Sequence, residues 1–203
     1  MASIHSVTLD VPDIAAAEAF YTSFGVAEHV AVRGAEPPTT GFRGYTLSLV
    51  VSQPNIADAF IESAIDAGAT TLKPAKRSFW GYGGVVKAPD GAIWKVATSS
   101  KKDAGPVTKT IDDIVLLLGV EDVKATKRFY VDHGLHVAKS FGSKYVEFTS
   151  ADSPLKLALY GRRALAKDAG VSPNGSGSHR LAIIGDAGTF TDPDEFTWET
   201  TPA

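Results

Sequence analysis

The sequence predicts an α+β protein built from two related halves in tandem, and three observations support this prediction. Each half opens with an alternating strand and an aspartate-capped helix, and each closes with a Pro-Asp turn followed by a tryptophan-bearing strand. The matching residues at the two openings are each 109 positions apart: Asp13 and Asp122, Phe20 and Phe129, Tyr21 and Tyr130, Gly25 and Gly134.

The elements of the first half follow from local patterns. Apolar residues at alternate positions over 7–11 indicate a half-buried strand. Asp13 then stands at the N-cap of an alanine-rich helix, and Gly25 ends it. A strand over 45–51 and a helix over 55–67 follow. The turn Pro89-Asp90-Gly91 leads into the closing strand.

The second half repeats this plan with one omission. The closing Pro193, Asp194 and Trp198 lie 104 positions after Pro89, Asp90 and Trp94. Strands are predicted over 145–149, 155–160 and 179–184, with a short helix over 163–169. The helix expected after the last of these strands is missing, because 185–188 runs almost directly into the closing turn. The predicted organisation is a first domain over 1–99, a linker over 100–109 and a shortened second domain over 110–203.

Composition narrows the functional classes. The chain has 203 residues, 44% hydrophobic and 21% charged, which is typical of a globular protein. Its net charge is -3 without basic clusters, so we expect no nucleic-acid partner, and no apolar run is long enough to predict a membrane span. Cysteine is absent, which excludes disulfides and thiolate chemistry and favours a cytoplasmic location.

The order of strand, Asp-capped helix ending in Phe-Tyr and glycine, further strands, and a Pro-Asp turn before an aromatic closing strand resembles the vicinal oxygen chelate superfamily. This group includes glyoxalase I, bleomycin-resistance proteins and extradiol dioxygenases. The resemblance covers nearly the whole chain. It implies tandem glyoxalase-like domains of βαβββ modules, with mixed curved sheets that form cup-shaped clefts and helices outside. Enzyme members hold a divalent metal in the concavity.

The resemblance also implies where metal ligands would lie. The opening-strand position falls at Ser6 and Val115, the closing-strand position at Lys95 and Glu199, and the second-module histidine at Thr46 and His179. The first domain therefore keeps no ligand. The second keeps His179 and Glu199, as a candidate catalytic acid/base or metal pair, with Glu147 as the best third candidate. Because a catalytic metal normally has three protein ligands, no metal is assigned, and Zn, Ni, Mn or Fe stays an alternative.

Strand alternation predicts a small-molecule site in the first domain. Hydroxyl groups should face the cup around Lys95, a set that suits an anionic or carbonyl-bearing ligand. The aromatic residues of 78–84 lie among glycines and offer flat surfaces for a planar molecule. Lys95 could instead reach solvent, and the aromatics could fill the core. The predicted ligand-binding residues are Ser6, Thr8, Thr46, Ser48, Phe79, Trp80, Tyr82 and Lys95.

Three functions remain open from the sequence. The first is a glyoxalase- or bleomycin-resistance-like protein that binds a small organic molecule without the full metal site. The second is a metal-dependent glyoxalase-like lyase or dioxygenase that uses His179 and Glu199. The third is a non-catalytic interaction domain with collapsed cups, which the apolar cup residues Val115 and Leu117 favour. Either a monomer or a homodimer is expected.

Overall fold

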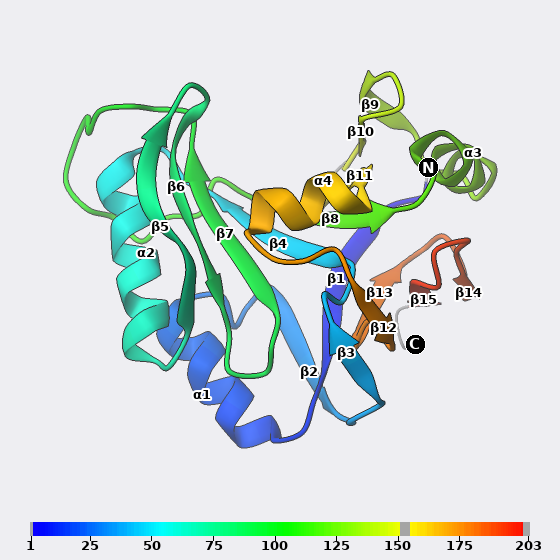
Figure 1. Cartoon of the computed structure of the whole chain (residues 1–203), viewed down its shortest axis with the longest axis horizontal. Helices are drawn as coiled ribbons and strands as arrows, with labels where there is room; N and C mark the ends of the chain where they lie inside the picture. Colours follow the sequence, from blue (N-terminus) through cyan, green and yellow to red (C-terminus); the bar gives the residue numbers. More distant parts are fainter. Residues whose placement is uncertain (1, 151–154, 201–203) are drawn as a thin grey trace.

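The computed structural model describes residues 2–150 and 155–200, which form an α+β fold of curved mixed sheets and helices (Figure 1). The larger sheet has eight strands, in the order β5-β6-β7-β4-β8-β11-β10-β9. The four strands from the first half are β4 (Tyr45–Val50), β5 (Thr70–Ser78), β6 (Gly81–Lys87) and β7 (Ile93–Thr98). The four from the second half are β8 (Asp113–Val120), β9 (Val137–Phe141), β10 (Tyr145–Phe148) and β11 (Leu155–Gly161).

The smaller sheet has five strands, in the order β14-β15-β13-β1-β2. Its members are β1 (Ile4–Val11), β2 (Val30–Gly34), β13 (Leu181–Gly185), β14 (Phe190–Thr191) and β15 (Thr197–Thr200). A two-stranded ribbon pairs β3 (Thr39–Gly41) with β12 (Gly175–Gly177). The eight-stranded and five-stranded sheets thus each combine strands from 1–99 with strands from 110–203, joined by the antiparallel pairs β4–β8 and β1–β13.

Three helices pack against the sheets on the side away from the cup, as predicted. They are α1 (Ile14–Phe24), α2 (Pro54–Asp66) and α3 (Val123–Asp132). The predicted caps of α1 and α3 are confirmed. The Asp13 carboxylate accepts from the Ala16 N–H at 3.0 Å, and Asp122 accepts from Lys124 and Ala125. Gly25 ends α1 with a φ of 92°, a left-handed conformation that glycine adopts without strain.

The core between the sheets and these helices repeats one polar contact in each half. The Tyr21 hydroxyl donates to Asp90 Oδ2 at 2.5 Å, and the Tyr130 hydroxyl donates to Asp192 Oδ2 at 2.6 Å. Burial is the largest cause that raises the pKa of both tyrosines, followed by the facing carboxylate. Each contact ties the end of a helix to the closing turn of its half.

The fourth helix departs from the expected plan of helices outside the cup. α4 (Arg162–Ala169) lies on the concave face of the eight-stranded sheet, in front of β4, β7 and β8 (Figure 1). Its Leu165, Ala166 and Ala169 are buried against Val85 and Ile93 of the sheet. The apolar side of α4 therefore fills part of the cup.

Two differences from the predicted elements have local causes. The strand expected from His179 begins at Leu181, because Arg180 has a φ of 52° and breaks the extended backbone. No helix lies between β13 and β15, in agreement with the predicted omission. Across residues 2–150 and 155–200, no helix is both long and apolar enough to cross a membrane.

Candidate functional site

One row of side chains crosses the middle of the eight-stranded sheet. Ser48 on β4 pairs with Lys95 on β7 and with Val115 on β8, and Val115 pairs with Lys156 on β11. Paired residues on neighbouring strands point to the same face, so all four side chains lie on the concave side. The row thus contains Lys95 and Val115, which the resemblance implied as metal positions of two different domains.

The chemistry of this row does not fit a divalent cation. Zinc, nickel, manganese and iron(II) take imidazole, carboxylate or thiolate ligands, whereas the row offers two ammonium groups, a hydroxyl and an isopropyl group. Lys95 and Lys156 instead pair with Asp168 and Asp113, each at 2.7 Å. In the described ranges no group of three or more His, Asp or Glu side chains could hold a metal ion.

Beside α4 the concave face forms a cavity of about 190 Å³. Its walls come from β5, β6, β7 and the last turn of α4, and lysine side chains contribute its positive charge. Its polar, charged and aromatic lining includes Lys73, Lys76, Ser78, Trp80, Lys95 and Asp168. Lys73 donates to the carbonyl oxygens of residues 167 and 168 at 2.7 and 2.6 Å and so caps the helix. The cavity is therefore basic, although the whole chain has a net charge of -3.

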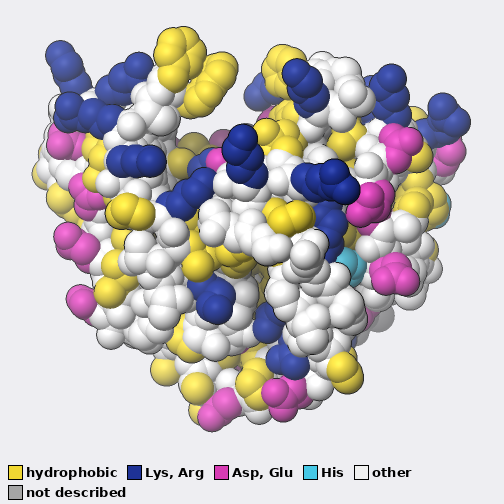
Figure 2. All heavy atoms as spheres, viewed as in Figure 1, with side chains coloured by type: hydrophobic (Ala, Val, Ile, Leu, Met, Phe, Trp, Pro, Cys, Tyr) yellow, Lys and Arg dark blue, Asp and Glu magenta, His cyan; other side chains and the backbone are white. Residues whose placement is uncertain are grey.

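The aromatic side chains of the β5–β6 turn lie at the rim of this concave face. Phe79 and Trp80 are 80% and 83% exposed and contact each other edge to face, with ring centroids 5.0 Å apart. Figure 2 shows the hollow between this hairpin and the β9–β10 hairpin, with hydrophobic and basic side chains on both rims. Tyr82 also lines the cavity, but its hydroxyl donates to Asp58 of α2 at 2.6 Å, away from the concave face.

The hydroxyl groups predicted around Lys95 fall into two groups. Thr46 and Ser48 lie on the concave face of the eight-stranded sheet and are both buried. Ser6 and Thr8 lie on β1 in the five-stranded sheet, where they pair with Ile184 and Ala182 of β13. The structure thus places Thr46 and Ser48 on the same face as Lys95, although only Lys95 of the three lines the cavity. It places Ser6 and Thr8 on the other sheet.

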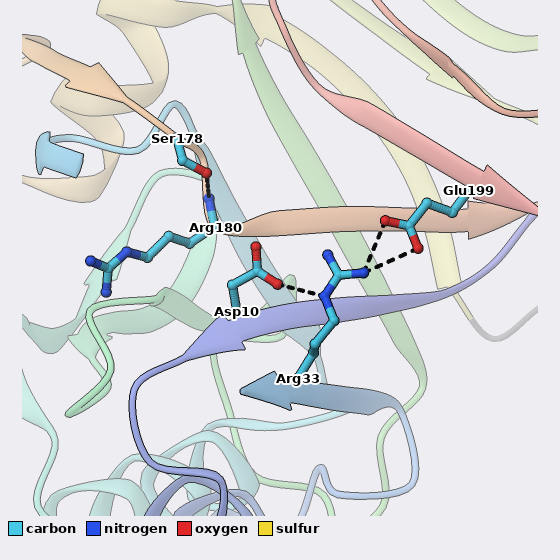
Figure 3. A network of polar contacts seen from close by, with 5 residues as sticks. All are labelled: Asp10, Arg33, Ser178, Arg180 and Glu199. Atoms are coloured by element: carbon cyan, nitrogen blue, oxygen red, sulfur yellow. Dashed lines mark hydrogen bonds and ion pairs between the residues drawn. The ribbon is translucent and has the colours of Figure 1, made fainter. Parts of the chain in front are cut away.

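Glu199 belongs to a polar network on the five-stranded sheet (Figure 3). The Arg33 guanidinium donates through Nε to Asp10 at 2.9 Å and through Nη1 to Glu199 Oε1 at 3.0 Å. Arg33 therefore occupies the side of Glu199 that a metal ion or a substrate proton would need. Glu199 acts here as one partner of an arginine clamp between β2, β1 and β15.

His179 has partners of its own. Its Nδ1 lies 2.5 Å from the Arg43 carbonyl oxygen and its Nε2 lies 2.9 Å from the Asp194 carbonyl oxygen. The ring also stacks on Phe196, with centroids 3.8 Å apart. Both ring nitrogens are thus engaged by backbone, and the ring holds the segment before β13 to the closing turn.

Glu147 lies on the far wall of the same concave face. It accepts from the Tyr145 hydroxyl at 2.8 Å and from Lys139 Nζ at 3.3 Å. Burial first and this carboxylate second raise the pKa of Tyr145. Glu147 pairs with Ala158 on β11 and so lies one row away from Lys95 and Ser48 along the strands. Among the described residues, Glu147 belongs to no group of three or more His, Asp or Glu side chains that could hold a metal ion.

Sequence reasoning missed three charged residues of the cavity: Lys73, Lys76 and Asp168. Lys73 and Lys76 lie on β5, which was not predicted as a separate strand. Asp168 lies on α4, whose position inside the cup has no local signature. The available signal was the apolar side of the predicted 163–169 helix, which needed an apolar partner.

The comparisons with known proteins concern the fold. No protein-family profile matches the chain, and no curated protein matches its sequence. Among solved structures, a V278E variant of glyoxalase I from Zea mays superposes with a TM-score of 0.60 at 14% identity and covers 98% of this chain and 92% of that chain. Glyoxalase I from Zea mays gives 0.56 at 15% identity, with 91% and 75% covered.

A candidate dioxygenase from Bacillus subtilis superposes with a TM-score of 0.57 at 13% identity and covers 98% of this chain and 84% of that chain. At this level of identity the likeness concerns architecture. It agrees with the element order and the curved sheets described above. The chain therefore has a glyoxalase-like fold, the fold that the sequence resemblance implied.

Proposed function

We propose that the chain binds a small planar organic molecule, with an anionic or carbonyl group, in the cavity beside α4. The cavity supports this because it combines lysine side chains with an exposed tryptophan in one concave surface. Ligand sites typically pair apolar or aromatic walls with a few placed polar groups. The volume of about 190 Å³ fits a metabolite-sized molecule better than a peptide.

The exposed aromatic pair is the observation that carries the proposal. Burying a tryptophan side chain contributes about 2 kcal/mol or more, so leaving Phe79 and Trp80 in water forgoes stabilisation. Neighbouring exposed aromatics are typical of contact surfaces. A planar ligand would cover the Trp80 ring while its polar group faced the lysines.

Binding in this cavity requires no metal ion. The row that crosses the eight-stranded sheet carries Lys95 and Lys156. Their ammonium groups supply the positive charge that a metal ion would supply in a metal-dependent site. His179 and Glu199, which a lyase or dioxygenase would need as a pair, bond to the Arg43 and Asp194 backbone and to Arg33 respectively. We therefore favour the metal-free binder over the metal-dependent enzyme.

Isothermal titration with a panel of planar carboxylates and ketones tests the proposal. The native chain and a Phe141→Ala variant should bind the same members of the panel, because Phe141 is an exposed aromatic outside the cavity. A Trp80→Ala variant should bind them at least about 5-fold more weakly, the loss of one aromatic contact of about 1 kcal/mol or more. No binding by the native chain, or equal binding by Trp80→Ala, would refute the proposal.

The cup could alternatively serve only as a structural surface, since α4 fills part of it. This interaction-domain function predicts no small-molecule binding by any variant. The titration above therefore separates the two.

A further inference from the structure

The charges that line the cavity beside α4 are uneven. Lys73, Lys76 and Lys95 lie on its walls, and Asp168 is the one acid among the lining residues. The Lys73 ammonium donates to backbone carbonyls of α4. The Lys76 ammonium has no hydrogen-bond or ion-pair partner among the described residues, although the Lys76 backbone pairs with Gly83 in the sheet. Lys95 Nζ donates to Asp168 Oδ2 at 2.7 Å. The carboxylate of Asp168 therefore occupies the Lys95 ammonium inside the cavity.

Asp168 is not what fixes α4 in the cup. The helix is anchored by buried Leu165, Ala166 and Ala169, and Lys73 caps its end. A carboxylate in the last turn is opposed by the helix dipole, by about 0.3–1 kcal/mol. Both partners of the Lys95–Asp168 pair are more than a third exposed, a setting in which an ion pair contributes about 0–1 kcal/mol. An external anion can therefore displace the Asp168 carboxylate from Lys95 at little cost in free energy.

An external carboxylate reproduces what Asp168 offers. It would accept the same charge-assisted hydrogen bond from Lys95, and Lys76 lines the same cavity and could donate a second one. A neutral amide of the same shape offers Lys95 only an uncharged oxygen, which is a weaker acceptor than the Asp168 carboxylate that it must displace. The cavity thus discriminates by charge as well as by shape.

We infer that Asp168 is an internal stand-in for a ligand carboxylate, and that the cavity beside α4 selects planar monocarboxylates. This inference rests on the proposed function and specifies its ligand class. Asp168 is then a specificity-determining residue, because every ligand must displace its carboxylate from Lys95. An anionic ligand replaces that acceptor well, whereas a neutral ligand replaces it poorly.

The test measures binding of 2-naphthoate and its neutral isostere 2-naphthamide by titration calorimetry. Asp168→Asn and Asp168→Ser remove the competing charge, and the serine variant also removes the amide oxygen that asparagine could offer to Lys95. Asp132→Asn is the matched control, since Asp132 is an exposed acid at the end of α3. Thermal denaturation of each variant verifies that it folds.

Both Asp168 variants should bind 2-naphthoate about 2- to 5-fold more tightly than the native chain, the worth of one exposed ion pair. Binding of 2-naphthamide should gain less than binding of 2-naphthoate, because an amide oxygen is a weaker acceptor for the freed Lys95 than a carboxylate. Asp132→Asn should match the native chain. Equal or weaker binding of 2-naphthoate by the Asp168 variants, or an equal gain for both probes, would overturn the inference and leave the proposed function standing. No binding of either probe by any variant would instead overturn the proposed function.

Discussion

Lys95 of β7 reaches across the concave face to Asp168 of α4, with Nζ and Oδ2 2.7 Å apart. This pair joins a strand of the first half to a helix of the second. The same row of the sheet holds a second pair, Lys156 with Asp113, of equal length and similar exposure. Lys95 lines the cavity and Lys156 does not, so the two lysines form a natural test and control.

Substituting Lys95 by Met should weaken binding of 2-naphthoate by about 2- to 5-fold or more, because the ligand carboxylate loses one partly exposed ion pair and then faces the unpaired Asp168 carboxylate. The stability of the variant should change by no more than about 1 kcal/mol, since the pair is partly exposed. Calorimetry and urea denaturation measure the two effects. Lys156→Met should leave binding unchanged, and a loss as large as that of Lys95→Met would place the site elsewhere.

The two Tyr–Asp contacts should differ in their contribution to stability. Tyr130→Phe leaves Oδ2 of Asp192, a residue only 5% exposed, without its side-chain donor. It also removes the acceptor of Trp198 Nε1. Tyr21→Phe leaves Asp90, which water can reach. We expect losses in the free energy of unfolding of about 2–3 kcal/mol and about 1 kcal/mol respectively.

Denaturant unfolding of both variants checks this order. Tyr160→Phe is the control, since the hydroxyl of Tyr160 has no hydrogen bond within the described residues, and its stability should match the native chain within about 0.5 kcal/mol. Equal losses at Tyr21 and Tyr130 would show that burial of the carboxylate does not set the cost.

Stability should fall steeply at alkaline pH. The hydrogen bond to Asp58 raises the pKa of Tyr82 to about 12, and burial raises the pKa of Tyr21 and Tyr130. In the unfolded chain tyrosine titrates near pH 10. From about pH 10 to 12 the unfolded chain therefore releases protons that the native state retains, so the free energy of unfolding falls as pH rises.

Absorbance of phenolate at 295 nm and circular dichroism should consequently change together in one transition above pH 10. A Tyr82→Phe variant should show a shallower loss of stability over the same window, because one titrating group is gone. Full phenolate formation with unchanged circular dichroism would contradict this expectation.

Divalent metals should not stabilise the chain. The row of Lys95, Ser48, Val115 and Lys156 offers no ligand set for Zn²⁺, Ni²⁺, Mn²⁺ or Fe²⁺, and Arg33 already binds Glu199. The melting temperature should stay within about 1 °C on addition of each metal. After dialysis, elemental analysis should find no bound metal. A stoichiometric metal content that survives dialysis, or a rise of several degrees, would instead support the metal-dependent enzyme.

The local elements of this fold could be predicted because their signals are local. The Asp13 and Asp122 caps, the alternating opening strands and the Pro-Asp turns each lie within a few residues of the structure they specify. The strand pairing between the halves could not be predicted in the same way. Ser6 meets Ile184 and Ser48 meets Val115 through contacts between distant segments, which no short pattern encodes.

This pairing explains why the site in the structure differs from the site that the sequence predicted. The sequence grouped Ser6 with Lys95 and Val115 with Glu199, whereas the sheets group Lys95 with Val115 and Ser6 with Glu199. Lys95 and Trp80 were predicted from residue type and alternation and share one cavity in the structure. Asp168 could not be found, because the docking of α4 depends on the assembled cup.

The location of the site is tested most directly by backbone amide chemical shifts during titration with 2-naphthoate. The amides of Lys76, Trp80, Lys95 and Asp168 should shift together along one saturating curve, because these residues line one cavity. The amides of the five-stranded sheet, such as that of Glu199, should stay in place. Shifts confined to the five-stranded sheet, with the cavity residues unmoved, would contradict a binding site beside α4.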